Sequence, residues 1–214
     1  PISQAKKNYD RMSRYYDMVA GIFEKKYKNR ALKRLNINSG ETVLEIGFGT
    51  GHSLVQIAER VGDQGKVYGI DLSTGMLEVC KKRLKKAGLM DRAKLNCWDA
   101  LDMPYQDNQF DAVFMSFTLE LFDTHEIPEV LCRIRRILKP DGRLGVVSMS
   151  KENGKSVMLK LYEWMHRKFP SHADCRPIYV QEALERARFL VKSREKAKLF
   201  GLPLEIVVGN CNSK

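Results

Sequence analysis

Three glycines and a carboxylate stand at spacings that suit the binding of a small ligand. The stretch LEIGFGTGHS, residues 44–53, places Gly47, Gly49 and Gly51 at alternate positions, with Glu45 two residues before the first of them. Glycine is required where the backbone takes a positive φ or approaches a ligand more closely than a Cβ atom allows. The loop therefore predicts that the chain bends around a ligand here.

This loop fits neither of the commonest phosphate-binding patterns. A dinucleotide loop of the form G-x-G-x-x-G that begins at Gly47 requires a small residue where His52 stands, and no Lys-Ser or Lys-Thr pair follows Gly51 as in a P-loop. Glu45 also adds negative charge where a dinucleotide would place its pyrophosphate. That charge favours a cationic ligand and opposes an anionic one.

Two further carboxylates follow the predicted second and third strands. Asp71 ends the run KVYGID, where a carboxylate can accept hydrogen bonds from both hydroxyls of a ribose. Asp99 stands in NCWDA, where it can accept from an adenine amino group while Ala100 offers a backbone N–H. The alternative for Asp99 is a helix cap or a turn. Together with the glycine loop, these residues predict a nucleoside lying across three successive strand ends.

Short β-rich runs alternate with stretches of helical periodicity from Thr42 onward. We expect strands at 42–46, 66–71, 93–98, 111–116 and 143–149, helices at 53–61, 74–87 and 127–138, and a turn over 139–142. A helix at 181–189, an extended stretch 191–200 and the run LEIVVG then predict a C-terminal antiparallel hairpin. The pattern favours an α/β fold: a doubly wound, mostly parallel seven-stranded sheet with helices on both faces.

The composition is that of an ordinary soluble globular protein. The 214 residues are 43% hydrophobic and 29% charged, and we expect one domain: covering helices in 1–38, a cofactor-binding core in 39–150, and a covering helix, a last helix and the hairpin in 151–214. We find neither a membrane-spanning apolar run nor a signal peptide, which predicts a cytoplasmic location. The five cysteines form no C-x-x-C pair, which argues against a metal site.

The formal net charge of +11 is concentrated near the N-terminus. Between Lys6 and Arg34, ten Lys or Arg residues stand against three acidic ones, with Tyr, Phe and Ile interleaved. Such a segment suits peripheral contact with an anionic membrane surface. A solvated helix face is the alternative, and it is favoured over membrane contact. The sequence does not indicate an oligomeric state.

Several runs carry a resemblance to a known family. VLEIGFGTG, WDA and LKPDGRLGVVSM, with the strand-ending Asp71, resemble the class I S-adenosylmethionine-dependent methyltransferases. RYYD, DMPYQDNQFDAV, DCRPIYV and GLPLEIVVG resemble the ubiquinone/menaquinone biosynthesis C-methyltransferase branch, so the resemblance covers nearly the whole chain. It implies a Rossmann-like methyltransferase fold, S-adenosyl-L-methionine as methyl donor and S-adenosyl-L-homocysteine as product.

The resemblance also implies a role for each site residue. Glu45 would support the loop and the donor's ammonium, the loop from Gly47 to Gly51 would bend around the methionine part, and Asp71 would hold the ribose hydroxyls. The remaining donor contacts would be Leu72 and Met76 against adenine, Asp99 and Ala100 at the adenine edge, Ser116 and Phe117 at the methyl end, and Tyr16 closing the pocket. Core packing is the alternative for Met76 and Tyr16.

Methyl transfer from a sulfonium is an in-line displacement, for which alignment of the two reactants supplies much of the catalysis. The sequence contains no matched acid/base pair that would indicate a catalytic mechanism beyond this alignment. Candidates for deprotonating an acceptor are His125 and the His172, Asp174 and Arg176 group. Solvated loop histidines are the alternative.

The sequence says least about the methyl acceptor. The resemblance implies a small-molecule or lipid-like acceptor, such as a prenylated quinol methylated on carbon, and phospholipid or other N- or O-methylation is the alternative. A nucleic-acid methyltransferase is disfavoured, because SFTLEL stands where an N-P-P-Y-like run or a catalytic Cys motif would follow the fourth strand. A non-catalytic S-adenosylmethionine-binding protein is a further alternative.

Overall fold

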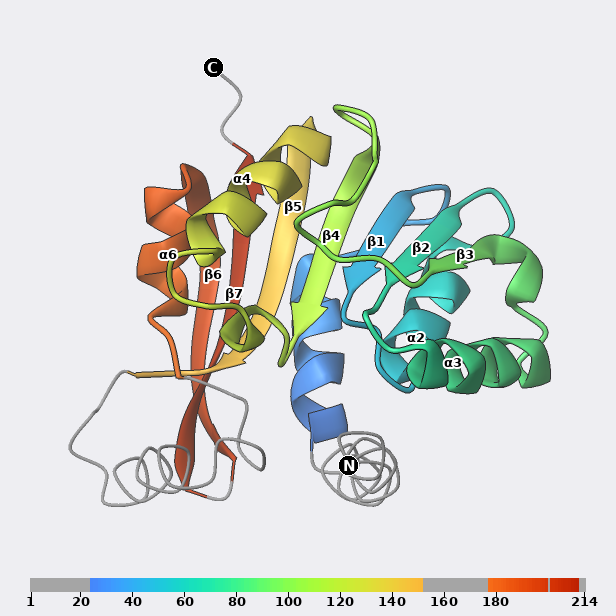
Figure 1. The fold of residues 1–214 in the computed structure, drawn as a ribbon, viewed down its shortest axis with the longest axis horizontal. Helices are drawn as coiled ribbons and strands as arrows, with labels where there is room; N and C mark the ends of the chain where they lie inside the picture. The colour runs from blue at the N-terminus through green and yellow to red at the C-terminus, as the bar shows by residue number, and fades with distance from the viewer. Residues whose placement is uncertain (1–23, 152–176, 200, 212–214) are drawn as a thin grey trace, which may run out of the picture.

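The structure is a computed structural model that describes residues 24–151, 177–199 and 201–211. Its strands form one seven-stranded sheet in the order β3-β2-β1-β4-β5-β7-β6 (Figure 1). These strands are β1 (Thr42–Ile46), β2 (Lys66–Ile70), β3 (Ala93–Asn96), β4 (Phe110–Ser116), β5 (Leu138–Met149), β6 (Phe189–Leu199) and β7 (Leu202–Cys211). The first five run parallel, whereas β7 is antiparallel to both β5 and β6. The predicted mostly parallel sheet with a C-terminal hairpin is confirmed.

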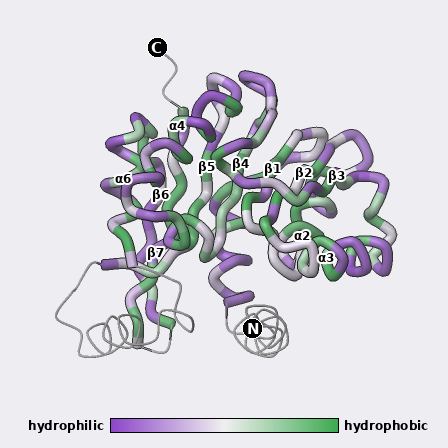
Figure 2. The backbone as a smooth tube through the Cα atoms, viewed as in Figure 1, coloured by the Kyte–Doolittle hydropathy of each residue, from purple (hydrophilic) through white to green (hydrophobic). Residues whose placement is uncertain are grey.

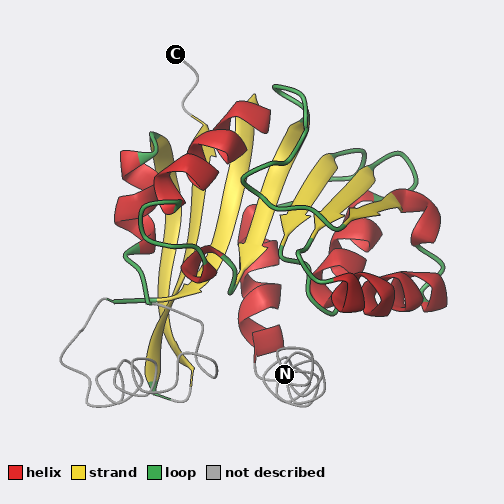
Figure 3. Ribbon diagram, viewed as in Figure 1, coloured by secondary structure: helices red, strands yellow, loops and turns green. Residues whose placement is uncertain are grey.

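Helices cover both faces of this sheet (Figure 3). A helix over residues 24–35, α2 (His52–Val61) and α3 (Thr74–Lys86) pack on one face, and α4 (Ile127–Ile137) and α6 (Val180–Arg186) pack on the other. Two single turns of 3₁₀ helix, η1 (Met90–Arg92) and η2 (Leu119–Leu121), precede β3 and follow β4. Hydrophobic residues gather along the strands between these layers (Figure 2).

The first strand shows how the sequence distributes side chains between the two faces. Leu44 and Ile46 belong to the core beneath α4 and α6, whereas Val43 belongs to the core beneath α2 and α3. Successive side chains of a strand point to opposite faces, so Glu45 points to the same face as Val43. The strand therefore carries a carboxyl group into the layer occupied by α2.

Most predicted boundaries lie within two residues of the observed ones, and two differ by more. The predicted turn over 139–142 lies inside β5, because Leu138 already pairs with Phe110 before the register shifts to the pair Ala112 and Arg143. The chain thus enters the sheet first and bends afterward. The predicted helix 181–189 ends at Arg186, because Arg188 takes a φ of 64° and Phe189 is buried as the first residue of β6.

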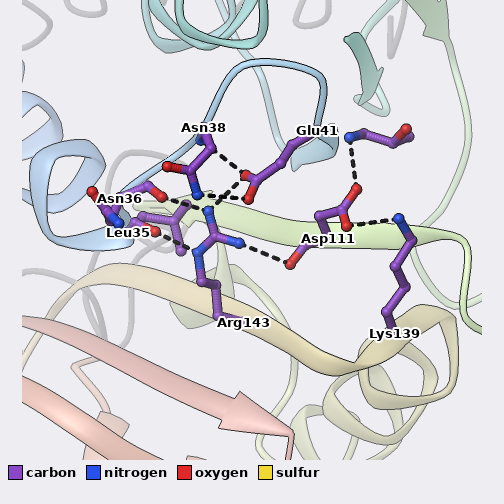
Figure 4. A network of polar contacts seen from close by, with 8 residues as sticks. Leu35, Asn36, Asn38, Glu41, Asp111, Lys139 and Arg143 are labelled. Atoms are coloured by element: carbon purple, nitrogen blue, oxygen red, sulfur yellow. Dashed lines mark hydrogen bonds and ion pairs between the residues drawn. The ribbon is translucent and has the colours of Figure 1, made fainter.

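A polar network anchors the helix 24–35 at the amino edge of the sheet (Figure 4). The Arg143 guanidinium donates to the carbonyl oxygens of Leu35 (2.5 Å), Asn36 (2.7 Å) and Asp111 (3.2 Å), and to the Glu41 carboxylate (2.7 Å). Twelve residues of α-helix extend about 18 Å. With its last turn fixed at this edge, the helix brings its first turn to the opposite edge, where the strands β1 and β4 end.

Candidate active site

The glycine loop lies where the strand order reverses. From β1 the chain proceeds outward to β2 and β3, and it returns to the other side of β1 as β4. Ligands of open α/β sheets bind beyond the carboxyl ends of the strands at such a point. Gly47, Gly49 and Gly51 have φ values of 73°, 50° and 78°, which a side chain would strain.

The three glycines serve different purposes. A Cβ atom at Gly47 would clash with the side chain of Thr118, and one at Gly51 would clash with Cys80. These two positions therefore need glycine for internal packing. A Cβ atom at Gly49 would meet nothing within 4 Å, so this residue borders open space in which a ligand can approach the backbone.

Asp71 joins the second strand end to this loop. Its Oδ2 accepts a hydrogen bond from the Gly49 N–H (2.8 Å), and its Oδ1 accepts one from the Ser73 N–H (2.9 Å). Burial raises the pKa of Asp71, whereas these two hydrogen bonds lower it. Because a carboxylate has about four acceptor positions, Asp71 retains capacity for the hydroxyls of a ligand.

Glu45 is a buried carboxyl group with spare hydrogen-bonding capacity. Only 1% of the residue is exposed, and its Oε2 atom has no hydrogen-bond partner among the described residues. Burial raises the pKa of Glu45 to about 8, with Lys28 acting to lower it and Asp71 to raise it further. Without a ligand, Glu45 is therefore mostly protonated at pH 7, and a nearby cation would favour its charged form.

His52 closes the loop instead of the small residue of a dinucleotide site. Its Nδ1 atom accepts a hydrogen bond from Arg83 (2.9 Å), which also donates to the Thr50 carbonyl oxygen (2.7 Å). Partial burial and the Arg83 charge lower the pKa of His52 to about 4. His52 is thus a neutral acceptor that, through Arg83, ties the start of α2 to α3.

The residues expected around adenine lie at the ends of β2 and β3. Leu72 follows Asp71 and is 70% exposed, and Met76 lies half-buried in the first turn of α3. Ala100 is buried. Asp99 accepts a hydrogen bond from the Leu101 N–H (2.9 Å), so it does stabilise a turn; its adenine contact stays a prediction.

The end of β4 is strained and packed against the loop. Ser116 is buried, and Phe117 takes a φ of 54°, an unfavourable conformation for a bulky residue. The Phe117 N–H nevertheless donates to the Val147 carbonyl oxygen (2.7 Å), and the Lys28 Nζ atom lies 5.7 Å from the Phe117 ring centroid. Strain of this kind persists only where the surroundings enforce it, and it clusters at functional sites.

Of the predicted bases, only His125 lies within the described residues. His125 is exposed in the turn before α4. Tyr16 and the group of His172, Asp174 and Arg176 lie outside the described residues. Within the described ranges, no three His, Cys, Asp or Glu side chains gather closely enough to hold a metal ion.

Sequence reasoning missed three residues at the carboxyl edge of the sheet. Thr118 packs on Gly47, the charge of Lys28 lowers the pKa of Glu45, and Glu120 is fully buried in η2. A carboxylate inside the otherwise apolar run SFTLELF was the available signal for Glu120. No sequence signal marks Lys28, because it is one of many basic residues near the N-terminus.

The residues present fit the methyl donor that the resemblance implies. S-adenosylmethionine carries an ammonium and a sulfonium charge, and the site offers Glu45 with a buried oxygen that lacks a partner. It is a nucleoside, and Asp71 has remaining acceptor positions beside the loop. The open space over Gly49 allows the donor to approach the backbone.

Comparisons with known proteins agree with this geometry. Residues 43–142 match a family model described as a methyltransferase domain. The chain is 32% identical over 193 residues to a demethylmenaquinone methyltransferase of Symbiobacterium thermophilum, covering 85% of this chain and 75% of that protein. It is 34% identical over 173 residues to a ubiquinone/menaquinone biosynthesis C-methyltransferase of Paraburkholderia phytofirmans, covering 78% of this chain and 68% of that protein.

A solved structure supports the fold. The crystal structure of an S-adenosylmethionine-dependent methyltransferase from Aquifex aeolicus superposes with a TM-score of 0.64 at 24% identity, covering 86% of this chain and 89% of that one. With the sheet order, the glycine loop and the relatives in agreement, the chain belongs to the class I S-adenosylmethionine-dependent methyltransferases, in the ubiquinone/menaquinone biosynthesis C-methyltransferase branch.

Proposed function

We propose that this methyltransferase transfers a methyl group to a ring carbon of a prenylated quinol. The observation that carries the proposal is the similarity of most of the chain to two enzymes named for quinone biosynthesis, a demethylmenaquinone methyltransferase and a ubiquinone/menaquinone biosynthesis C-methyltransferase. The site is compatible with it, because the end of β4 presents the apolar Phe117 and the exposed Leu121.

In this proposal the donor lies over the ends of β1, β2 and β3. Glu45 faces its ammonium, the loop from Gly47 to Gly51 follows its methionine part, and Asp71 accepts from its ribose hydroxyls. Leu72 and Met76 border the adenine, with Asp99 and Ala100 at its edge. The methyl end would lie near Ser116 and Phe117 at the end of β4, next to the acceptor, and Tyr16, which lies outside the described residues, would close the pocket.

The chain contributes mainly alignment and exclusion of water. When bound, S-adenosylmethionine supplies an electrophilic methyl group whose transfer removes positive charge from sulfur. Fixing donor and acceptor in line supplies roughly 7 to 11 kcal/mol of the barrier reduction in well-oriented reactions. The rigid loop, held by Asp71 on Gly49 and by Thr118 packed on Gly47, provides the fixed half of that geometry.

Calorimetry on Asp71→Ala tests the donor site. The substitution removes the acceptor for the ribose hydroxyls and the hydrogen bond that holds the Gly49 N–H, so we expect S-adenosylmethionine binding to weaken by about 10- to 100-fold. Far-ultraviolet circular dichroism checks that the variant keeps its fold. Unchanged affinity in a folded Asp71→Ala protein would show that the nucleoside assignment is wrong.

Transfer of a labelled methyl group tests the acceptor. The purified protein is incubated with labelled donor and, separately, a short-chain demethylmenaquinol, anionic and zwitterionic phospholipids, and a tRNA pool. We expect label in the naphthoquinol ring carbon and in none of the others. Label in a phospholipid or in tRNA instead would contradict the quinol proposal, and donor binding without transfer to any acceptor would favour a non-catalytic binding protein.

A quinol with a prenyl tail resides in a membrane, which leads us to propose peripheral contact through the basic N-terminal segment. Most of that segment lies outside the described residues, and none of the helices in the described ranges is long and apolar enough to cross a bilayer. Flotation with vesicles containing anionic lipid tests the contact. Protein that stays at the bottom of the gradient at low salt contradicts it.

A further inference from the structure

A second buried carboxyl group lies at the end of β4. Glu120 stands two residues after Thr118, which packs on the glycine loop, and it lies in η2 beyond the carboxyl end of β4. The residue is 0% exposed. Its Oε1 atom accepts a hydrogen bond from the Met149 N–H (3.1 Å) at the end of β5, whereas its Oε2 atom has no partner among the described residues.

This arrangement is hard to explain as packing alone. Leu119 and Leu121 flank Glu120, and an apolar residue between them would satisfy the core without leaving a buried oxygen unpaired. Among the described residues no cation pairs with this carboxyl group, and the charged residue of the helix 24–35 that affects its pKa is the acidic Glu24. A buried polar atom without a partner calls for a reason beyond stability.

Burial, more than the surrounding charges, favours the neutral form of Glu120. Burial raises its pKa to about 7, hydrogen bonds from the Met149 N–H and the Ser148 hydroxyl lower it, and Glu24 raises it. Glu24 itself pairs with Lys28 (2.8 Å), so the facing charged groups are this ion pair on the helix 24–35. A carboxyl group poised near neutral pH is suited to accept and return a proton.

Glu45 and Glu120 are each influenced electrostatically by a residue of the same helix. Lys28 acts on Glu45 and Glu24 acts on Glu120, although the two helical residues are one turn apart. Glu45 belongs to the strand that carries the glycine loop, and Glu120 follows the strand whose end faces the acceptor in the proposed function. Glu120 therefore lies on the acceptor side of the reaction.

We propose, resting on the proposed function, that Glu120 accepts the hydroxyl proton of the quinol as its ring carbon is methylated. The ring oxygen releases its proton to Oε2 and its electrons form a C=O bond, while the ring carbon forms the new bond to methyl. The electron pair of the broken S–CH₃ bond stays on sulfur. Glu120 then returns its proton to the ring oxygen as the methylated carbon loses its hydrogen to solvent, which restores the aromatic ring with a net release of one proton.

Methyl transfer by Glu120→Gln across pH 5.5 to 9 tests this role. Glutamine keeps an oxygen that can accept from the Met149 N–H but cannot take a proton. We expect kcat to fall by about 100-fold or more, and the rise of the wild-type rate with pH near 7 to disappear, because only the wild type gains a base on deprotonation. S-adenosylmethionine affinity and the melting temperature report separately on the donor site and the fold.

Two further variants make the test specific. Glu41→Gln alters a partly buried glutamate at the opposite edge of the sheet, and we expect an unchanged pH profile. Glu24→Gln removes the acidic neighbour of Glu120, and we expect the rise of the rate to move to lower pH. A Glu120→Gln protein with a lower melting temperature but the wild-type rate and pH profile would overturn the inference, leaving Glu120 a structural residue.

Failure of the inference can be told from failure of the proposed function. If the wild type methylates the quinol and Glu120→Gln does so equally well, the quinol assignment stands and the proton acceptor is wrong. If the wild type methylates a different acceptor, the quinol assignment is wrong, and the same pair of pH profiles measured with that acceptor tests Glu120. Absence of turnover with every acceptor contradicts both.

Discussion

Donor binding should expel a proton from Glu45. Because burial places the pKa of this carboxyl at about 8, it carries close to 0.9 of a proton at pH 7 in the free protein. A positive charge about 4 Å away is worth about 4 kcal/mol at an effective dielectric constant near 20. At 1.36 kcal/mol per unit, that interaction would lower the pKa by about 3 units, to about 5.

Two measurable consequences follow from this shift. Binding of S-adenosylmethionine at pH 7 should release about 0.9 of a proton, and the affinity should increase roughly 50-fold between pH 6 and pH 8. Calorimetry in buffers of different ionisation enthalpy gives the proton count, and titrations across that range give the affinity. Glu45→Gln should release no proton from this position and should lose the dependence on pH, with weaker binding at pH 8.

The same substitution should affect stability in the opposite direction. A carboxyl whose pKa is raised in the folded state stabilises the fold fully below its unfolded value of 4.5, and this contribution is lost as the pH rises through 8. The loss has a ceiling of about 5 kcal/mol. Without donor, Glu45→Gln should therefore melt at a higher temperature than the wild type at pH 8.5. Equal proton release by wild type and variant, or a wild-type affinity that is independent of pH, would refute this reasoning.

Two other perturbations test the loop and the core. Gly49→Ala and Gly40→Ala both place a Cβ atom on a residue with positive φ and open space, so each variant should lose about 1 kcal/mol of stability. Only Gly49→Ala should abolish donor binding measured by calorimetry. Retained binding by Gly49→Ala would contradict the close approach of the donor to the glycine loop. Leu44→Ala should lower the free energy of unfolding in urea by about 2 to 5 kcal/mol, whereas Leu190→Ala, at a position 46% exposed, should lose less than about 1 kcal/mol; equal losses would contradict the assigned core.

Sequence reasoning located the donor side because its residues follow a regular rule. The glycine loop, Asp71 and Asp99 each come directly after a β-rich run, and the carboxyl ends of neighbouring parallel strands share one edge. The observed hydrogen bond from the Gly49 N–H to Asp71 brings two of these elements together as expected. Local pattern is sufficient where each functional residue stands at the end of a strand.

The acceptor side could not be located in this way, because its residues depend on contacts between distant segments. Glu120 resembles any polar residue in a loop until the structure shows that it is fully buried and accepts a hydrogen bond from the Met149 N–H. His125, which has a more typical catalytic side chain, is exposed instead. The burial of a single carboxyl group depends on tertiary contacts, so no periodic pattern in the sequence reveals it.

The helix 24–35 carries a charged residue that influences each of the two buried carboxyl groups, Glu45 and Glu120. Arg143 holds its C-terminal end through the carbonyl groups of Leu35 and Asn36 and also bonds Asp111 and Glu41 at the amino edge of the sheet, which leaves its first turn at the site. There, Lys28 favours the charged form of Glu45 and Glu24 favours the neutral form of Glu120. Burial is the main cause of both raised pKa values, and the two members of this ion pair adjust them in opposite directions. Lys28 thereby supports a carboxylate that can face the cationic donor, and Glu24 supports a carboxyl group that can exchange a proton with the acceptor near neutral pH.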